Sequence, residues 1–223
     1  MQYRHEWKIE ISYGDLLTLR RRLRAVAKSD PHAADGHYFI RSLYFDTPEN
    51  TALWEKIDGV NRREKYRIRY YNGDPTVIHL EKKGKLNGLC SKESAAVTAG
   101  QVQELLNGNT AWMAESQNAV IREFYSKYRT QNLRPKTIVD YTREPFIYEP
   151  GNVRVTFDYN IRTGILCTDF LNPDCVTVPA GETPILMEVK WDTFLPDVIR
   201  DAVQIPGRRV GAFSKYAQCR IYG

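Results

Sequence analysis

Hydrophobic and charged side chains alternate one for one in several short segments of the chain. In residues 63–71 (REKYRIRYY) the hydrophobic positions are Tyr66, Ile68 and Tyr70, and the cationic positions between them are Lys65, Arg67 and Arg69. Successive side chains of a β-strand point to opposite faces of its sheet. The segment therefore predicts a strand with one hydrophobic face and one face of three mutually repelling cations.

The same alternation recurs in four other segments, at 5–11, 77–83, 152–158 and 186–191. Their polar positions are almost all ionisable: Glu6, Lys8, Glu10, His79, Glu81, Lys83, Arg154, Asp158, Glu188 and Lys190. For any one strand, the ordinary interpretation is a half-exposed sheet with its polar side in water. Five strands with the same ionisable face favour a different arrangement, in which these faces share one enclosed, wet space.

Strand and helix signals are mixed along the chain. Alternation and turn residues predict strands at 4–12, 37–46, 64–71, 76–83, 89–97, 136–148, 152–159, 162–168 and 184–191. Helical spacing and capping residues, including Ser12, Thr47, Thr98 and Ser214, predict helices at 15–28, 47–58, 98–106, 114–129, 196–203 and from 214. This order predicts an α+β fold, an antiparallel β-barrel with peripheral helices. No Pro-, Gly- or Ser-rich linker divides the sequence, so we expect one domain over residues 1–223.

The composition is that of an ordinary globular protein with a mild positive charge. The 223 residues are 42% hydrophobic and 26% charged, with a formal net charge of +5. That excess allows an anionic partner without requiring one. The four cysteines show no C-x-x-C spacing, so we expect reduced thiols. There is no signal-peptide pattern and no apolar run near the roughly 20 residues that span a bilayer, so we expect a soluble, cytoplasmic protein.

Closing the sheet into a barrel gives the charged faces a function. The hydrophobic faces would pack outward under the helices, and the cations and carboxylates would line the lumen. A bound polyanion would relieve the repulsion between the cations. Arginine offers a planar fork matched to phosphate, lysine offers a point charge, and a carboxylate can hold a divalent metal ion. The pattern therefore predicts a tunnel for triphosphate or polyphosphate.

Nucleic acid is a weaker alternative as the anionic partner. Residues 66–71 interleave aromatic side chains with arginines, as single-strand binders do. In a strand, however, the two kinds of side chain lie on opposite faces and do not form one stacking platform. We therefore expect no nucleic-acid partner.

Eight segments together resemble a known family. They are R4-H-E-W-K8, R41-S-L-Y-F-D-T47, K65-Y-R-I-R69, L80-E-K-K83, Y141-T-R143, R154-V-T-F-D158, M187-E-V-K190 and F213-S-K-Y216. In this order they resemble the VTC domain, the polyphosphate polymerase domain of the vacuolar transporter chaperone complex. That domain belongs to the CYTH, or triphosphate tunnel metalloenzyme, superfamily.

The resemblance implies roles for individual residues. The implied catalytic residues are Arg67, Arg69, Lys190 and Glu188, and Glu188 is also the implied ligand of Mn²⁺ or Mg²⁺. The implied phosphate-binding residues are Lys8, Lys65, Lys83, Lys92, Arg154, Arg162, Ser214 and Lys215. One tunnel arginine of the family matches either Arg162 or Arg143. The first strand reads Glu6-x-Lys8-x-Glu10 where the superfamily often has Glu-x-Glu-x-Lys, so no metal role is implied for Glu6 or Glu10.

The implied activity is metal-dependent transfer of the γ-phosphoryl group of ATP to a growing polyphosphate chain. The same tunnel would serve a CYTH-type triphosphatase, in which water is the nucleophile, or a non-catalytic module that binds polyphosphate or nucleotide. The sequence leaves these alternatives open. It has neither the SPX domain nor the membrane helices of the eukaryotic complexes, so translocation of a product would require a separate membrane-protein partner.

Overall fold

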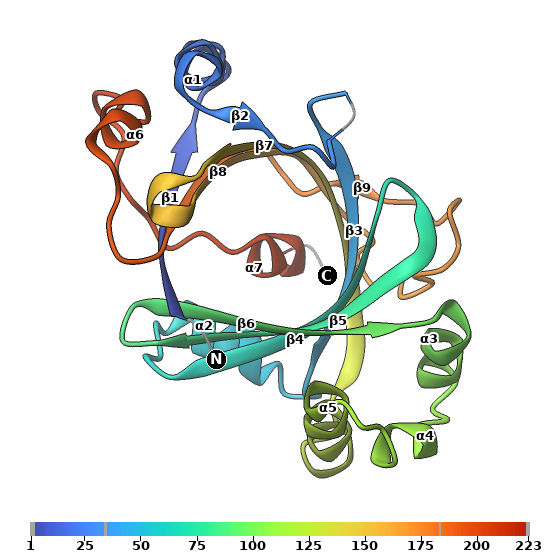
Figure 1. Ribbon diagram of the computed structural model, residues 1–223. Helices are drawn as coiled ribbons and strands as arrows, with labels where there is room; N and C mark the ends of the chain where they lie inside the picture. The colour runs from blue at the N-terminus through green and yellow to red at the C-terminus, as the bar shows by residue number, and fades with distance from the viewer. Residues whose placement is uncertain (1–2, 34, 183, 222–223) are drawn as a thin grey trace.

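The computed structural model describes residues 3–33, 35–182 and 184–221, and its strands form one closed antiparallel barrel (Figure 1). Neighbouring strands follow the order β7-β3-β4-β5-β6-β1-β10-β8, and β8 pairs with β7 to close the ring. The barrel strands are β1 (Tyr3–Ile11), β3 (Tyr38–Asp46), β4 (Arg63–Tyr71), β5 (Asp74–Leu86), β6 (Leu89–Val97), β7 (Arg134–Tyr148), β8 (Val153–Thr163) and β10 (Ile185–Trp191). Short strands β2 (Lys28–Ser29) and β9 (Val178–Pro179) add to β7 and β8. The predicted antiparallel barrel is confirmed.

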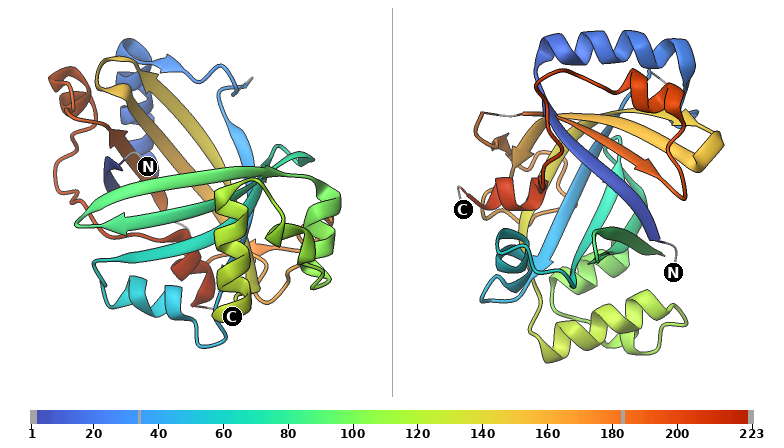
Figure 2. Two further views of the ribbon diagram at one scale, coloured as in Figure 1. Left: turned by 60° about the horizontal axis from the view of Figure 1, so that its bottom comes forward. Right: turned by 90° about the vertical axis from the view of Figure 1, so that its left-hand side faces the viewer.

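Helices lie mainly around the outside of the barrel (Figures 1 and 2). They are α1 (Tyr13–Val26), α2 (Thr51–Ile57), α3 (Ala99–Leu106), α4 (Ala111–Ala114), α5 (Ala119–Thr130), α6 (Asp197–Ala202) and α7 (Lys215–Arg220), with a 3₁₀ turn at Pro150–Asn152. In the part of the chain that the structure describes, no helix is both long and apolar enough to span a membrane.

The hydrophobic face of each alternating strand points outward, under the helices. Tyr66 and Ile68 of β4 pack in one buried cluster with Phe124 of α5. Val155 of β8 packs in a second cluster, with Leu19 of α1. Burying one such side chain contributes about 1.5–3 kcal/mol to folding. The strand parity predicted from the sequence is thus confirmed, and it leaves the ionisable faces for the interior.

Tight turns close the cation-bearing hairpins, and in the β4–β5 hairpin the register shifts between Arg69 and Tyr71, before the cation rows begin. Asn72 and Gly73, with φ of 52° and 71°, connect β4 to β5, and Asn87 and Gly88 connect β5 to β6 with φ of 50° and 81°. Two-residue hairpin turns favour Asn-Gly because both positions need positive φ. The predicted turn at 72–75 is therefore shorter than expected, and β5 begins at Asp74.

The predicted start of the second helix is wrong. Thr47 was expected to cap a helix beginning at Pro48, but α2 begins at Thr51 and its N-cap is Asn50, in the left-handed region. The buried carboxylate of Asp46 instead accepts hydrogen bonds from the backbone N–H groups of residues 52 and 53, at 2.8 and 3.1 Å. The Asp46 carboxylate therefore shares the capping role with the predicted residue Thr47, whose hydroxyl accepts from the backbone N–H of Thr51 at 3.1 Å.

Two other predicted boundaries are also wrong. The helix expected at 114–129 begins later, as α5 at Ala119, because Asn118 caps it by accepting from the backbone N–H of Val120, and the separate short helix α4 ends at Ala114. The two strands expected at 152–159 and 162–168 are one strand, β8, which ends at Thr163. The capping boxes of Ser12 and Thr98 and the Ser214 cap are confirmed.

The last helix, α7, enters the ring of strands (Figure 1). Tyr216 stacks on Tyr44 of β3 with ring centroids 5.0 Å apart, and its hydroxyl donates to Asp46 at 2.8 Å. Tyr216 also packs with Tyr141 and Ile161 in an interior cluster. Part of the lumen is therefore filled by side chains, and α7 brings Lys215 to the barrel interior.

Candidate functional site

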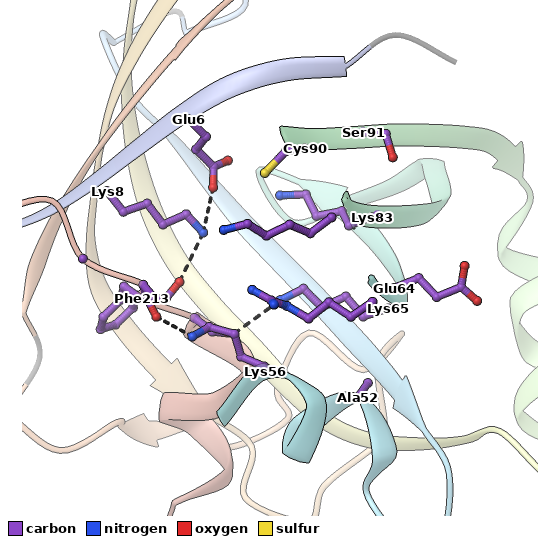
Figure 3. A pocket seen from close by; sticks show the side chains of 16 residues that line it. Glu6, Lys8, Ala52, Lys56, Glu64, Lys65, Lys83, Cys90, Ser91 and Phe213 are labelled. Carbon is purple, nitrogen blue, oxygen red and sulfur yellow. Dashed lines mark hydrogen bonds and ion pairs between the residues drawn. The ribbon is translucent and has the colours of Figure 1, made fainter. Parts of the chain in front are cut away.

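A cavity of about 120 Å³ opens into the barrel between β1, β4, β5, β6 and α2, and the segment 211–214 forms one wall (Figure 3). Its charged lining residues are Glu6, Lys8, Lys56, Arg63, Glu64, Lys65, Lys83 and Lys85. Figure 3 shows the ammonium groups of Lys8, Lys65 and Lys83 directed into the same space, while the Glu64 carboxylate points away. Glu64 pairs instead with Lys82 and Lys127. Six cations thus face a cavity in which Glu6 is the one inward carboxylate of this lining.

The β4–β5 register stacks these cations in rows. Arg63 lies opposite Lys85, Lys65 opposite Lys83, and Arg67 opposite Glu81. Directly opposed side chains have Cβ atoms about 4.5–5.5 Å apart, and like charges in such pairs are destabilising. Within the described residues, neither Lys65 nor Lys83 has a carboxylate within 4.0 Å. No carboxylate neutralises this row, so an anion that binds here would favour the charged ammonium forms of both lysines.

Glu81 is the shared ion-pair partner of one network of cations. It contacts Arg67 at 2.7 Å and Lys92 at 2.8 Å, with Arg69 at 3.9 Å. Arg67 also donates to the Tyr44 hydroxyl at 2.8 Å. Arg67 and Arg69 are only 4% and 3% exposed. Burial alone would raise the pKa of Glu81, but Arg67 and Arg69 hold that pKa well below its usual value.

Glu188 is the shared partner of a second network of cations, which come from four secondary-structure elements. Its carboxylate contacts Lys190 and Lys215 at 3.2 Å, Arg143 at 3.4 Å and Lys8 at 3.8 Å. Burial would raise the pKa of Glu188, but these cations, led by Lys190, keep it well below the usual range. The β1–β10 register, which places Lys8 opposite Glu188, builds this network.

Glu6 and Asp158 extend the second network. Glu6 contacts Lys8 at 3.0 Å and Lys190 at 3.2 Å, and Asp158 contacts Arg143 at 2.6 Å and also Lys215. The predicted catalytic set is therefore divided: Arg67 and Arg69 contact Glu81, whereas Lys190 contacts Glu188. Burial, followed by the positive charges of Lys190 and Arg67, lowers the pKa of Lys83. Cations of both networks therefore act on the Lys83 ammonium group.

The remaining predicted phosphate-binding residues do not all lie at the cavity. The Ser214 hydroxyl accepts from Lys65 at 3.3 Å and so lies at the cavity. Arg154 lies at the rim, where it pairs with Asp30 at 2.9 Å. Arg162 faces away and donates to the Thr177 hydroxyl at 3.0 Å. Of the two tunnel arginine candidates, the structure brings Arg143, rather than Arg162, beside Glu188.

Sequence reasoning missed several residues of the site. Arg63 and Lys85 share the strand parity of Lys65 and Lys83, so the alternation could have found them. Lys56 comes from a helix, and the alternation gives no signal for it. The anchoring role of Glu81 depends on the register between strands.

The acidic residues test whether a divalent cation fits. Across residues 3–33, 35–182 and 184–221 no three His, Cys, Asp or Glu side chains form a group that could hold a metal ion alone. Glu188 and Glu6 are nevertheless linked through Lys190. Mg²⁺ usually binds through one or two carboxylates, several waters and the phosphates of a substrate. This donor set fits a metal ion that binds together with a phosphate chain.

Phosphate binding at Lys65 would be sensitive to pH. Burial, then Lys8 and Arg67, lowers its pKa to about 7. A bound phosphate would favour the ammonium form and raise that pKa, so binding above pH 7 takes up protons and affinity falls as pH rises. We expect weaker tripolyphosphate binding at pH 9 than at pH 7.5, although the anion itself becomes more negative over this range.

Calorimetry in buffers of different ionisation enthalpy measures this proton uptake. The matched variant Lys65→Arg/Lys83→Arg keeps both charges but cannot lose them near neutral pH, so its uptake should be absent. Equal uptake in wild type and variant would contradict the assignment.

Two solved structures share the fold of this chain. A candidate adenylate cyclase from Bacillus halodurans matches with a TM-score of 0.51 and 14% identity, over 85% of this chain and 80% of that chain. A candidate adenylyl cyclase from Hippeastrum, described as having a dominant triphosphatase activity, matches with a TM-score of 0.59 and 13% identity, over 98% and 95%. At these identities the likeness shows the shared fold.

The family assignment comes from the sequence. The family model of the VTC domain matches residues 3–221, and the chain belongs to the VTC domain family. The resemblance drawn from the eight motifs is confirmed. No curated protein matches the chain.

Proposed function

We propose that this protein is a polyphosphate polymerase that transfers the γ-phosphoryl group of ATP to a phosphate chain inside the barrel. The observation that carries the proposal is the row of Lys65 and Lys83, two inward cations without a carboxylate partner among the described residues. Holding such cations together costs stability, and a bound polyphosphate would repay that cost. Membership in the VTC domain family supports the same reading.

The residues of the chain would contribute mainly position and charge. Lys8, Lys65 and Lys83 would bind non-bridging phosphate oxygens, and Lys190 and Arg143 would stabilise charge at the transferring group. Phosphoryl transfer needs little covalent chemistry from a protein, so pre-arranged cations supply most of the catalysis. The attacking phosphate oxygen is already anionic and needs no general base.

Mn²⁺ or Mg²⁺ would be held by Glu188, with Glu6 as a neighbouring carboxylate. When bound, such an ion neutralises phosphate charge and orients the chain. In the absence of substrate both Glu188 oxygens contact cations, Lys215 on Oε1 and Lys190 on Oε2. Metal and phosphate chain would therefore enter together, as the phosphates replace Glu188 as the partner of these cations.

A triphosphatase is the second candidate, and the Hippeastrum protein with this fold favours it. Its water nucleophile would enter the same cavity. A non-catalytic polyphosphate-binding module would use the cations alone. In either polymerase or module, ATP and polyphosphate are the proposed ligands, and a separate membrane protein is the proposed partner for any translocation.

Product analysis separates these functions. Purified protein is incubated with labelled ATP and Mn²⁺ or Mg²⁺, with and without a short polyphosphate primer, and the products are resolved on a gel. The proposal predicts a ladder of phosphate chains together with ADP. Free phosphate without chains would establish a triphosphatase, and binding without products would establish a binding module.

A further inference from the structure

The cation rows continue outward beyond the residues that the proposed function uses. Arg63 and Lys85 form the row at the cavity mouth, one step outside Lys65 and Lys83, and all four line the same cavity. Lys56 of α2 lines it too. Burial, then Arg63, Lys8 and Lys85, lowers the pKa of Lys56, as expected for a cation placed among cations. These three residues, Lys56, Arg63 and Lys85, are called the mouth cations below.

The mouth cations lack carboxylate partners. In the described parts of the chain, none of them has a carboxylate oxygen within 4.0 Å; Lys56 donates to the backbone carbonyl of Ala212 and Arg63 to that of Val60. Glu64, the adjacent carboxylate, pairs with Lys82 and Lys127. Three unneutralised cations at one opening repel one another, and a surface without a ligand gains nothing from this arrangement.

The length of the cation rows exceeds the length of a triphosphate. Rows on one strand face repeat every two residues, about 6.8 Å. From Arg63 to Arg69 on β4 the rows cover six residues, about 20 Å. A triphosphate has only two P–O–P links and covers a fraction of this distance.

We propose that the mouth cations Lys56, Arg63 and Lys85 form an outer subsite that binds the part of a polyphosphate chain lying beyond the reacting triphosphate. This inference rests on the proposed function and specifies its ligand as a polymer. The subsite favours long chains over tripolyphosphate and holds a chain at the cavity during transfer. A triphosphatase for short substrates has no use for it.

The test compares two anions on three proteins. Tripolyphosphate and a long-chain sodium polyphosphate are titrated into wild type, into Arg63→Gln/Lys85→Gln, and into the control Arg21→Gln/Arg62→Gln. The control removes the same charge from arginines that are exposed and lie outside the cavity. We expect the mouth variant to lose at least about 10-fold in affinity for the long chain and less than about 3-fold for tripolyphosphate, because charge-assisted contacts are lost only at the mouth. The control should bind both anions within about 2-fold of wild type.

Each other outcome is decisive. Equal losses for both anions, or equal losses in mouth variant and control, would overturn the outer subsite while leaving the proposed function intact. Wild type that binds neither anion would instead remove the proposed function. The mouth variant relieves a like-charge pair and should melt no lower than wild type. If it does not fold, Lys56→Gln, a change on α2, repeats the comparison.

Discussion

Replacing Glu188 with glutamine is expected to lower kcat by about 10²–10³-fold, with phosphate binding retained or strengthened. Glutamine keeps the shape of the side chain but removes the charge that orients Lys190, Lys215 and Arg143, at 3.2–3.4 Å, and that would hold a metal ion. Because a negative charge leaves a cationic interior, the dissociation constant for tripolyphosphate measured without a metal ion should not rise. Steady-state kinetics and a binding titration on the same preparation separate the two effects.

The matched control for this variant is Glu104→Gln, on the exposed face of α3, which should leave kcat unchanged. A Glu188→Gln enzyme with kcat within about 3-fold of wild type would contradict the assignment, since removing one group that stabilises the transition state typically costs far more. Loss of anion binding together with activity would also count against it.

Replacing Glu81 with glutamine is expected to destabilise the folded protein by about 3–5 kcal/mol. Glu81 is fully buried and anchors Arg67 and Lys92, and without its charge these cations and Arg69 have no buried counter-charge at this position. Because its folded pKa is lowered, the stabilisation is present at neutral pH and is lost as the pH falls below the unfolded value of about 4.3.

Urea denaturation at pH 7 measures the Glu81 effect, with Glu104→Gln again as the control. Added tripolyphosphate should restore more stability to Glu81→Gln than to wild type, because the anion replaces the missing charge and binds the variant more tightly. A destabilisation below about 1 kcal/mol would show that Arg67 and Arg69 do not depend on Glu81 for neutralisation.

The barrel and most of its inward residues could be predicted because they follow from a period of two. The alternation can be recognised because each strand has one hydrophobic and one ionisable face, and Asn72-Gly73 marks the turn of the hairpin that carries most cations. The family motifs supplied the order of the segments. The alternation also predicts correctly that Lys65 and Lys190 face the barrel interior.

Parity failed where the backbone interrupts it. In β8, Arg154 and Asp158 face inward, and continuing the alternation would point Arg162 inward as well. Asn160 instead adopts φ of 52°, and the β7–β8 register shifts nearby. Ile161 consequently joins the interior cluster and Arg162 turns out toward Thr177. A bulge of this kind has no reliable signal in a single sequence.

The sequence likewise could not predict which cations are paired with carboxylates. The partners of Glu188 come from β1, β7, β10 and α7, and the closure of the barrel alone brings them together. The Lys65–Lys83 row, which has no carboxylate partner among the described residues, and Arg67, which is paired with Glu81, look the same in the sequence. Their difference in the structure is what distinguishes a binding surface from its supporting network.

The structure of the protein with tripolyphosphate and Mn²⁺ tests the central claim most directly. We predict phosphate groups inside the barrel, with oxygens in hydrogen-bonding contact with Lys65 and Lys83, and Lys190 contacting phosphate where it now contacts Glu188. Phosphate bound only on the outer surface, with the Lys65–Lys83 row unchanged, would contradict a phosphate-binding tunnel.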